Sequence, residues 1–292
     1  MTSRSALPAP VEAVCTTFLS AVPDGLVTGL YLRGGLGFGE WVEGTSDVDF
    51  TATLSRRPDA DDVEALRLAH ARLTARHGDS PFFDGSHLLA DDLTRSPAEC
   101  PDAPAVLMHD FAVRSAYDPV SWHELARHGV TFTGPPVESL GIWTDDEVLR
   151  AHTVDNLGTY WRRQVAGCAA DPGRAASDVA CEWVVPGVAR LHHLLVTGEQ
   201  TAKSLAVHWG LSYYPERWHR VLRESLAVRE GVLERQYDDP AERGRDVTAF
   251  GAYVVGLYAG PSSSTVGVSS PTGTSPASRL PSGASGQAQA GS

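Results

Sequence analysis

The fold of the N-terminal region is decided by residues 30–50, which read LYLRGGLGFGEWVEGTSDVDF. The apolar run at residues 27–32 has the composition of a β-strand and leads into a glycine-rich turn. Glycine lets such a turn approach a ligand closely, and its backbone N–H groups can hold phosphate oxygens. A second strand is predicted over residues 48–54, where the side chains alternate with a period of two. The pattern therefore predicts two strands joined by a loop suited to a phosphate ligand.

Two carboxylates stand at the start of the second strand. Asp47 and Asp49 are two residues apart, so in a strand both point to the same face of the sheet. Carboxylates held side by side repel each other unless a positive group joins them, and Mg²⁺ prefers oxygen ligands of this kind. A solvated pair of aspartates in a turn has the same spacing. The spacing alone therefore leaves a metal site and a solvated turn as alternatives.

The rest of the chain divides into two patterns. Short strand-like runs alternate with a helical segment up to about residue 119, and after about residue 143 the apolar spacing is helical. We predict an α/β domain, a mixed sheet flanked by helices, over residues 8–135 and an all-α helical bundle over residues 143–258. Residues 260–292 are rich in Gly, Ser and Pro and have almost no bulky apolar side chains, so we expect a disordered tail there.

Local signals predict the individual elements. Further strands are predicted over residues 82–89 and 106–113, and helices over residues 63–76, 144–165, 178–196, 200–209 and 215–234. The first C-terminal helix should begin with a capping box, in which Thr144 and Glu147 bond to each other's backbone N–H. Pro186 and Gly187 should kink or break the helix that contains them, and Gly198 should end it.

Composition and charge narrow the class of protein. Of 292 residues 42% are hydrophobic and 21% are charged, as in soluble globular proteins, and no apolar run is long enough to span a membrane. The net charge of −12 disfavours nucleic acid as a partner and suits a cationic one. Four cysteines without a CxxC spacing and an N-terminus without a signal-peptide pattern indicate a cytoplasmic protein with free thiols. We also expect the protein to be a monomer.

Several familiar catalytic motifs are absent or incomplete. The sequence has no GxxxxGK phosphate loop and no GxSxG elbow, and Gly35, Gly37 and Gly39 lack the spacing of a dinucleotide fingerprint. His123 and His128 bound the stretch HELARH, but histidines five residues apart on a helix diverge too far to share one metal ion. These absences leave the glycine-rich loop and its aspartates as the motif that carries chemistry.

Three segments resemble one family. Residues 30–50 resemble the nucleotidyltransferase signature of the polymerase-beta-like superfamily, and are most similar to the aminoglycoside adenylyltransferases that modify streptomycin and spectinomycin. Residues 83–88 resemble the family's second strand, which carries a third carboxylate. Residues 188–204 resemble its C-terminal signature, an Arg on one helix followed by Thr-Gly and then a Lys. The resemblance covers about residues 25–235.

The resemblance implies a reaction and assigns residues to it. AMP would move from ATP to a hydroxyl group, with pyrophosphate leaving. Asp47, Asp49 and Asp84 would hold Mg²⁺, and Asp84 would also accept the proton of the acceptor hydroxyl. The phosphates would be bound by residues of the loop and by two cations from the helical domain, namely Gly34, Gly35, Ser46, Arg190 and Lys203.

This sequence departs from the family pattern at two of these positions. Gly35 stands where the family has Ser, so one hydroxyl contact to the phosphates is missing. Asp84 stands where related drug-modifying enzymes commonly have Glu, so its carboxylate has a shorter arm.

The acceptor site is less clearly marked, because the acids that contact the drug in the family are not clearly reproduced. The nearest candidates are Asp178 and Glu182, and Glu40 and Glu43 are further candidates for an acidic rim that would attract a cation. The rings of Trp161 and Trp183 would offer faces to a cationic sugar, with a place in the helix–helix core as the alternative for both.

The predicted function is therefore that of an Mg²⁺-dependent adenylyltransferase, with ATP as co-substrate and a cationic, aminoglycoside-like acceptor, acting in antibiotic resistance. Two alternatives stay open. One keeps the fold and the donor but takes another acceptor, a biosynthetic intermediate or a protein. The other is a homologue that binds nucleotide or ligand without turnover, against which three converging acids argue.

Overall fold

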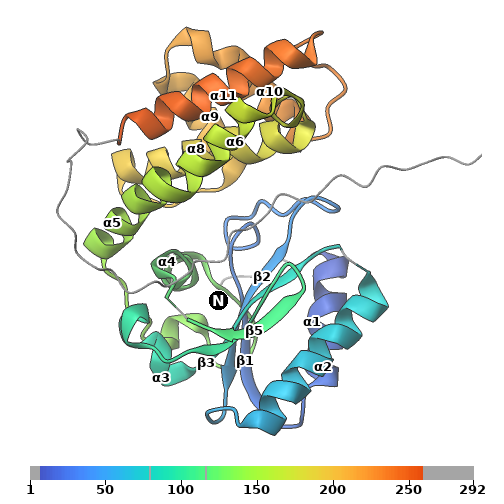
Figure 1. Cartoon of the computed structure of the whole chain (residues 1–292). Helices are drawn as coiled ribbons and strands as arrows, with labels where there is room; N and C mark the ends of the chain where they lie inside the picture. The colour runs from blue at the N-terminus through green and yellow to red at the C-terminus, as the bar shows by residue number, and fades with distance from the viewer. Residues whose placement is uncertain (1–6, 79, 116, 259–292) are drawn as a thin grey trace, which may run out of the picture.

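The computed structural model describes residues 7–78, 80–115 and 117–258. The tail predicted over residues 260–292 lies outside these described residues. Figure 1 shows two regions, a sheet with its helices formed by the N-terminal residues and a bundle of helices formed by the C-terminal residues. None of the described helices is long and apolar enough to cross a membrane.

The N-terminal region is built on a six-stranded sheet with the order β5-β4-β3-β2-β1-β6. Only the β2–β3 pair among these is parallel, so the sheet is mixed, as predicted. The strands are β1 (Val27–Leu32), β2 (Val48–Leu54), β3 (Phe83–Leu89), β4 (Ala103–Leu107), β5 (Asp110–Arg114) and β6 (Val130–Thr133). The prediction of one strand over residues 106–113 is wrong, because Met108 and His109 take positive φ angles of 48° and 64° and reverse the chain into a hairpin.

Helices cover both faces of this sheet. One face packs against α1 (Ala9–Ala21) and α2 (Ala60–His77), which lie side by side in Figure 1. Phe18 of α1 and Phe50 of β2 are fully buried there with their ring centroids 5.8 Å apart. The N-cap Asp59 forms a capping box with Asp62 that starts α2.

The opposite face of the sheet packs against α4 (Pro119–His128), α3 (Ala90–Leu93) and two 3₁₀ turns, η1 (Pro97–Glu99) and η2 (Val137–Leu140). Tyr31 of β1 is buried on this face with Trp122 and Leu125 of α4. Since side chains alternate along a strand, the residues that share the face of Tyr31 are directed towards α4. This alternation decides where the polar residues of β2 and β3 lie.

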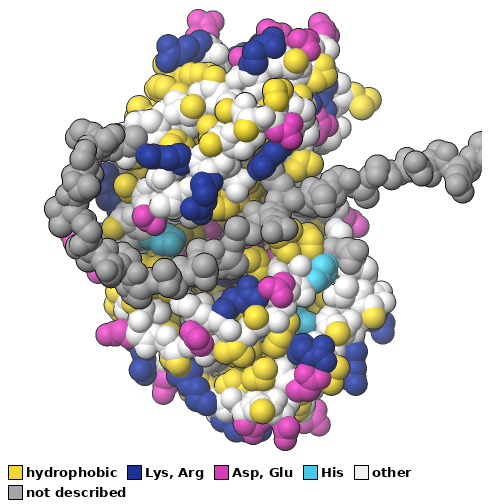
Figure 2. Space-filling model, in the orientation of Figure 1, with side chains coloured by type: hydrophobic (Ala, Val, Ile, Leu, Met, Phe, Trp, Pro, Cys, Tyr) yellow, Lys and Arg dark blue, Asp and Glu magenta, His cyan; other side chains and the backbone are white. Residues whose placement is uncertain are grey.

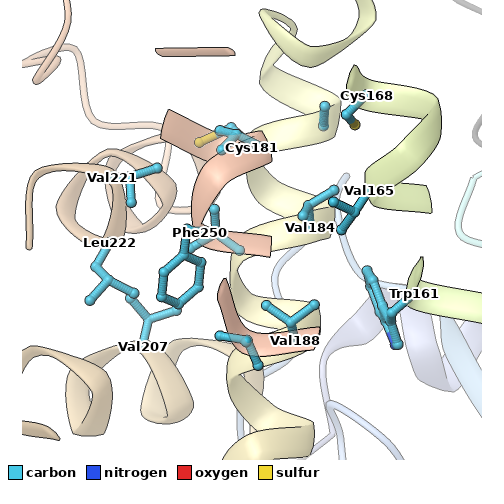
Figure 3. Packing of buried hydrophobic residues seen from close by; sticks show 14 of the residues in the cluster. Trp161, Val165, Cys168, Cys181, Val184, Val188, Val207, Val221, Leu222 and Phe250 are labelled. Atoms are coloured by element: carbon cyan, nitrogen blue, oxygen red, sulfur yellow. The ribbon is translucent and has the colours of Figure 1, made fainter. Parts of the chain in front are cut away.

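The C-terminal region is entirely helical. Its elements are α5 (Asp146–Asn156), a π-helical turn (Leu157–Trp161), α6 (Arg162–Ala170), α7 (Pro172–Ala175), α8 (Asp178–Thr197), α9 (Lys203–Tyr213), a 3₁₀ turn (Glu216–Trp218), α10 (His219–Arg229) and α11 (Pro240–Gly256). Figure 3 shows Phe250 of α11 close to Val207 and Leu222, beside the valines of α8. The predicted fold class is therefore confirmed, whereas the domain boundaries at residues 135 and 143 stay a prediction.

Two local predictions in the helical region differ from the structure, one of them only in part. The carboxylate of Asp145 caps α5 by accepting from the N–H groups of Glu147 and Val148 at 2.9 and 3.0 Å, so Thr144 is not the cap. Helix α8 continues through Pro186, so the predicted break does not occur, whereas the predicted kink stays a prediction. Gly198 does end α8, with φ of 81°.

Candidate active site

The parallel pair of strands brings two acids together. In the β2–β3 register Asp49 lies opposite Asp84, and directly paired residues of a parallel ladder share a face. Both side chains line a hollow of about 350 Å³ on the α4 side of the sheet. Asp47 directly precedes β2 and is exposed to solvent.

Burial and neighbouring carboxylates raise the pKa values of two of these acids. Burial raises the pKa of Asp84 to about 7, with a bond from the Met108 N–H lowering the pKa and the charges of Asp47 and Asp49 raising it. Desolvation by the surrounding protein, and then the charge of Asp49, raise the pKa of Asp47 to about 6. The acids therefore lie within electrostatic range of one another, and a cation among them would relieve their repulsion.

The turn after β4 fixes the carboxylate of Asp84. The backbone N–H of Met108 donates to both of its oxygens, with N–O distances of 2.9 and 3.1 Å. The left-handed conformation of Met108 and His109 directs this N–H towards β3. The hairpin therefore positions the acid that the sequence marks as the base.

The donor set fits Mg²⁺ in its chemistry, because it offers only carboxylate oxygens. Within the described part of the chain, however, no group of three or more His, Cys, Asp or Glu side chains is already arranged to hold a metal ion. The protein would therefore supply only part of the coordination, as is usual where substrate phosphates and water complete it.

The glycine-rich loop packs tightly against the acids. Gly34 has φ of 59°, and a side chain at this position would collide with the carboxylate of Asp49. A Cβ at Gly35 would lie 2.8 Å from the carbonyl oxygen of Glu40. The Ser46 hydroxyl oxygen accepts from the Val42 N–H at 3.0 Å and closes the end of the loop.

Two residues at this site were missed by the sequence analysis. A guanidinium nitrogen of Arg33 lies 3.3 Å from a carboxylate oxygen of Glu124 and 3.6 Å from one of Asp49. Burial raises the pKa of Glu124, and the positive charges of Arg33 and Arg190 lower it. The alternation along β1 was a usable signal for Arg33. Glu124 had none, since it lies 91 residues from Arg33 in the chain.

The helical region contributes two cations beside the acids. Lys203 Nζ lies 4.9 Å from the ring centroid of Trp183. Burial, and then the charge of Arg190, lower the pKa of Lys203 to about 8, while Glu182 and Asp47 raise it. Lys203 and Arg190 therefore face the sheet region closely enough to interact electrostatically with Asp47 and Glu124 respectively.

A second hollow, about 310 Å³ in volume, lies between α4 and the helical region. Its wall includes Trp161, Trp183 and Arg190 from the helical region and Glu124 from α4. Residues Val120, His152 and Asn156 border both this hollow and the one that contains Asp49 and Asp84. The two hollows therefore adjoin.

Comparison with known proteins agrees with this architecture. Residues 174–256, which include Arg190 and Lys203, match the family described as aminoglycoside adenylyltransferase, C-terminal domain. This part of the chain is therefore similar to the C-terminal domain of the aminoglycoside adenylyltransferases. The fold of the chain is similar to that of spectinomycin adenyltransferase AAD(9) from Enterococcus faecialis, solved with ATP and spectinomycin, with a TM-score of 0.59 and 14% identity over 83% of this chain and 98% of that chain. A search of curated proteins found no match.

The two acids predicted to bind the acceptor form ion pairs with arginines of the helical region. Asp178 pairs with Arg235 and Arg243 at 2.8 and 2.7 Å, and it borders neither hollow. Glu182 pairs with Arg229 at 2.7 Å and also borders neither. Both acids are therefore paired with arginines, and their contact with an acceptor stays a prediction.

Trp161 lies both in the core of the helical region and at the border of a hollow. Its side chain is only 4% exposed and belongs to the core of the helical region, yet its ring borders the 310 Å³ hollow beside Trp183. The rings of the two tryptophans are 5.8 Å apart. Trp161 can therefore present one edge to a ligand while the rest of the ring supports the helices.

Proposed function

We propose that the protein is an Mg²⁺-dependent nucleotidyltransferase that moves AMP from ATP to a hydroxyl group of an aminoglycoside-like small molecule. The observation that carries this proposal is the register pairing of Asp49 with Asp84, next to Asp47 and opposite Lys203 of the helical region. A group of acids, with Asp84 buried and Asp47 and Asp49 partly open to solvent, faced by a cation from a second region suits the transfer of a charged phosphoryl group.

The chain's own residues divide the work of the transfer. The loop at Gly34, Gly35 and Ser46 would hold the phosphates through backbone N–H groups, while Arg190 and Lys203 neutralise their charge. Bound Mg²⁺ would supply charge neutralisation at the phosphate oxygens.

Asp84 would act as the base in this reaction. The acceptor oxygen forms a bond to the α-phosphorus, the bond from that phosphorus to the β-phosphate oxygen breaks, and pyrophosphate leaves. The proton of the acceptor hydroxyl passes to Asp84, whose pKa of about 7 suits a general base near neutral pH.

The hollow beside Trp161 and Trp183 would hold the acceptor. Two side-chain atoms of described residues, the indole N–H of Trp183 and the amide oxygen Oε1 of Gln200, are buried without a hydrogen-bond partner. Both residues line this hollow. A sugar-like molecule carries the hydroxyl and amino groups that would satisfy this donor and this acceptor. The ring faces would support its apolar side.

A specific observation also favours an acceptor less cationic than an aminoglycoside. Arg163 and Arg190 line the hollow together with Glu124 and Asp155, so its charged groups are balanced in sign. On the face drawn in Figure 2, acidic and basic side chains are likewise interspersed over both regions. A neutral or weakly basic acceptor with the same donor is therefore the second candidate.

The test is pyrophosphate release by the full chain with ATP, Mg²⁺ and a panel that contains streptomycin, spectinomycin and neutral sugars or cyclitols. We expect turnover with at least one member and a product heavier by one AMP in mass spectrometry. A drug-susceptibility assay of cells that express the protein then separates the two acceptor classes. ATP binding without turnover on any member would contradict the proposal and favour a non-catalytic homologue.

Substitution of the base gives a sharper check. Asp84→Asn should lower kcat at least about 100-fold while the folded protein still binds ATP, because the variant lacks a proton acceptor. Asp102→Asn is the matched control, since Asp102 is exposed and borders neither hollow. Activity of Asp84→Asn close to wild type would remove Asp84 from the chemistry.

A further inference from the structure

The carboxylate of Glu40 joins the glycine-rich loop to the helical region. Its oxygens accept from the backbone N–H of Ser204 at 3.0 and 3.2 Å and from the Ser204 hydroxyl at 2.7 Å. Arg229 Nε donates to the same carboxylate at 2.7 Å. The side chain of Glu40 is only 17% exposed, so this contact is largely shielded from water. Glu40 therefore belongs to the joint between the two regions rather than to an acidic rim open to solvent.

Glu40 supplies what the start of α9 lacks. Ala202 is the N-cap of this helix and has no side chain that can accept from the free N–H groups. The Glu40 carboxylate takes that place from the other region, and its negative charge also suits the positive end of the helix dipole. Lys203, the first residue of α9, precedes Ser204 directly. The cap therefore fixes the backbone from which Lys203 extends.

Arg229 extends this joint to two more helices. Its guanidinium lies between Glu40 and Glu182 of α8, at 2.7 Å from each, and its side chain is 6% exposed. Arg229 is the last residue of α10. One contact therefore ties the loop to α8, α9 and α10, and removal of either charge would leave the other buried and unpaired.

The same residue also closes the loop itself. The backbone N–H of Glu40 donates to the carbonyl oxygen of Gly35 at 2.8 Å. Gly35 follows Gly34, which packs against the carboxylate of Asp49. The backbone of Glu40 thus shapes the loop beside the acids, while its side chain holds the helix that carries Lys203.

We propose that Glu40 is a positioning residue, which with Ser204 and Arg229 keeps the glycine-rich loop and Lys203 at the mutual distance that a bound triphosphate requires. This inference rests on the proposed function, since it concerns the same nucleotide site. Glu40 does not contact the reacting atoms. Instead, Glu40 raises the fraction of molecules in which the two regions are arranged to bind the triphosphate.

The test compares Glu40→Gln, Arg229→Gln and the double variant at a temperature well below their unfolding. Each single variant should raise the dissociation constant and KM for Mg-ATP about tenfold and leave kcat within about twofold, because a less populated competent state weakens apparent affinity. The double variant should bind Mg-ATP no more weakly than the weaker-binding single variant, since both residues act through one contact. Controls are Glu64→Gln, on an exposed ion pair of α2, and Arg220→Gln, on an exposed ion pair of α10.

The outcomes separate this inference from the proposed function. A lowered unfolding temperature with unchanged ATP affinity, a loss confined to kcat, or additive effects in the double variant would overturn the positioning role. Small-angle scattering of the nucleotide-free chains gives a measure that needs no activity. Glu40→Gln and the double variant should have a larger radius of gyration than wild type, and equal radii would overturn the inference. Failure of the wild-type protein to bind ATP would instead refute the proposed function. The scattering comparison would then still test whether Glu40 holds the two regions together.

Discussion

At Gly35 the backbone of the loop leaves no room for a side chain. A Cβ there would lie 2.8 Å from the Glu40 carbonyl oxygen, whose residue closes the loop through its own N–H. The family that this sequence resembles has Ser at this position, so the glycine removes a hydroxyl. In the structure the loop around Gly35 is tightly packed. Without the serine hydroxyl, backbone N–H groups of the loop would bind the phosphates.

Gly35→Ser therefore should not strengthen phosphate binding, although it adds the missing hydroxyl. We expect the variant to lose about 1–3 kcal/mol of unfolding free energy, as overpacking does, and to bind ATP more weakly than wild type. Urea denaturation and calorimetric titration with ATP measure the two effects. Tighter ATP binding by the variant would show that the loop can open to admit the hydroxyl.

The three aspartates show which part of the site a sequence can reveal. Asp47 and Asp49 are two residues apart in the chain, and Asp84 stands in a strand whose pattern is recognisable, so each has a local signal. Asp178 and Glu182 were chosen by their distance from Arg190 along the chain. Their actual partners are arginines from α10, α11 and the segment between them, and no spacing in the sequence predicts these contacts.

At the scale of elements, α8 depends on a contact between distant helical segments. The ring of Trp161, at the end of the π-helical turn, lies where a side chain at Gly187 would be. Helix α8 continues through the proline and glycine at 186 and 187, and the glycine makes room for the tryptophan. A pattern rule for Pro-Gly cannot foresee this, because the tryptophan comes from another element.

Gly187→Ala tests this contact. Alanine favours a helix by about 1 kcal/mol over glycine, but the collision with Trp161 should outweigh that gain and lower the unfolding free energy by about 1–3 kcal/mol. Gly158→Ala is the matched control, because a Cβ at Gly158 meets nothing within 4 Å. Equal stability of the two variants in urea denaturation would contradict the packing described for α8.

The elements themselves were predictable to different degrees. The strands β1, β2 and β3 and the helices α2 and α8 carry clear periodic patterns. The β4–β5 hairpin was not foreseen, because its turn uses Met108 and His109 in a left-handed conformation that glycine or asparagine usually marks. The start of α9 was also misplaced, since its cap comes from Glu40 in another region.

For the whole molecule, buried histidines link stability to pH. Burial lowers the pKa of His87 to about 4. Its Nε2 lies 3.3 Å from Nε2 of His70, whose pKa burial also lowers. Between about pH 6.5 and 4 the unfolded chain binds a proton at His87 that the folded chain does not. The contribution of neutral His87 to the unfolding free energy is therefore fully present above about pH 6.5, and it is lost as the pH falls towards 4.

The contribution of His87 is measured as a difference, because the raised pKa of Asp84 acts in the opposite direction over the same range. Wild type should lose about 3 kcal/mol of unfolding free energy relative to His87→Gln between pH 6.5 and 4. Denaturant unfolding of both proteins at several pH values gives this difference. A difference that does not change with pH would mean that His87 titrates normally in the folded protein.

The two adjoining hollows have a consequence for inhibitor design. Val120, His152 and Asn156 form a wall common to both, so the distance from one to the other is short. A single compound in which an adenine nucleotide is tethered to a cyclitol would occupy both at once. The tether would make the second contact intramolecular, and affinity would then exceed that of either half by about 10²–10⁴ if its length matches the gap.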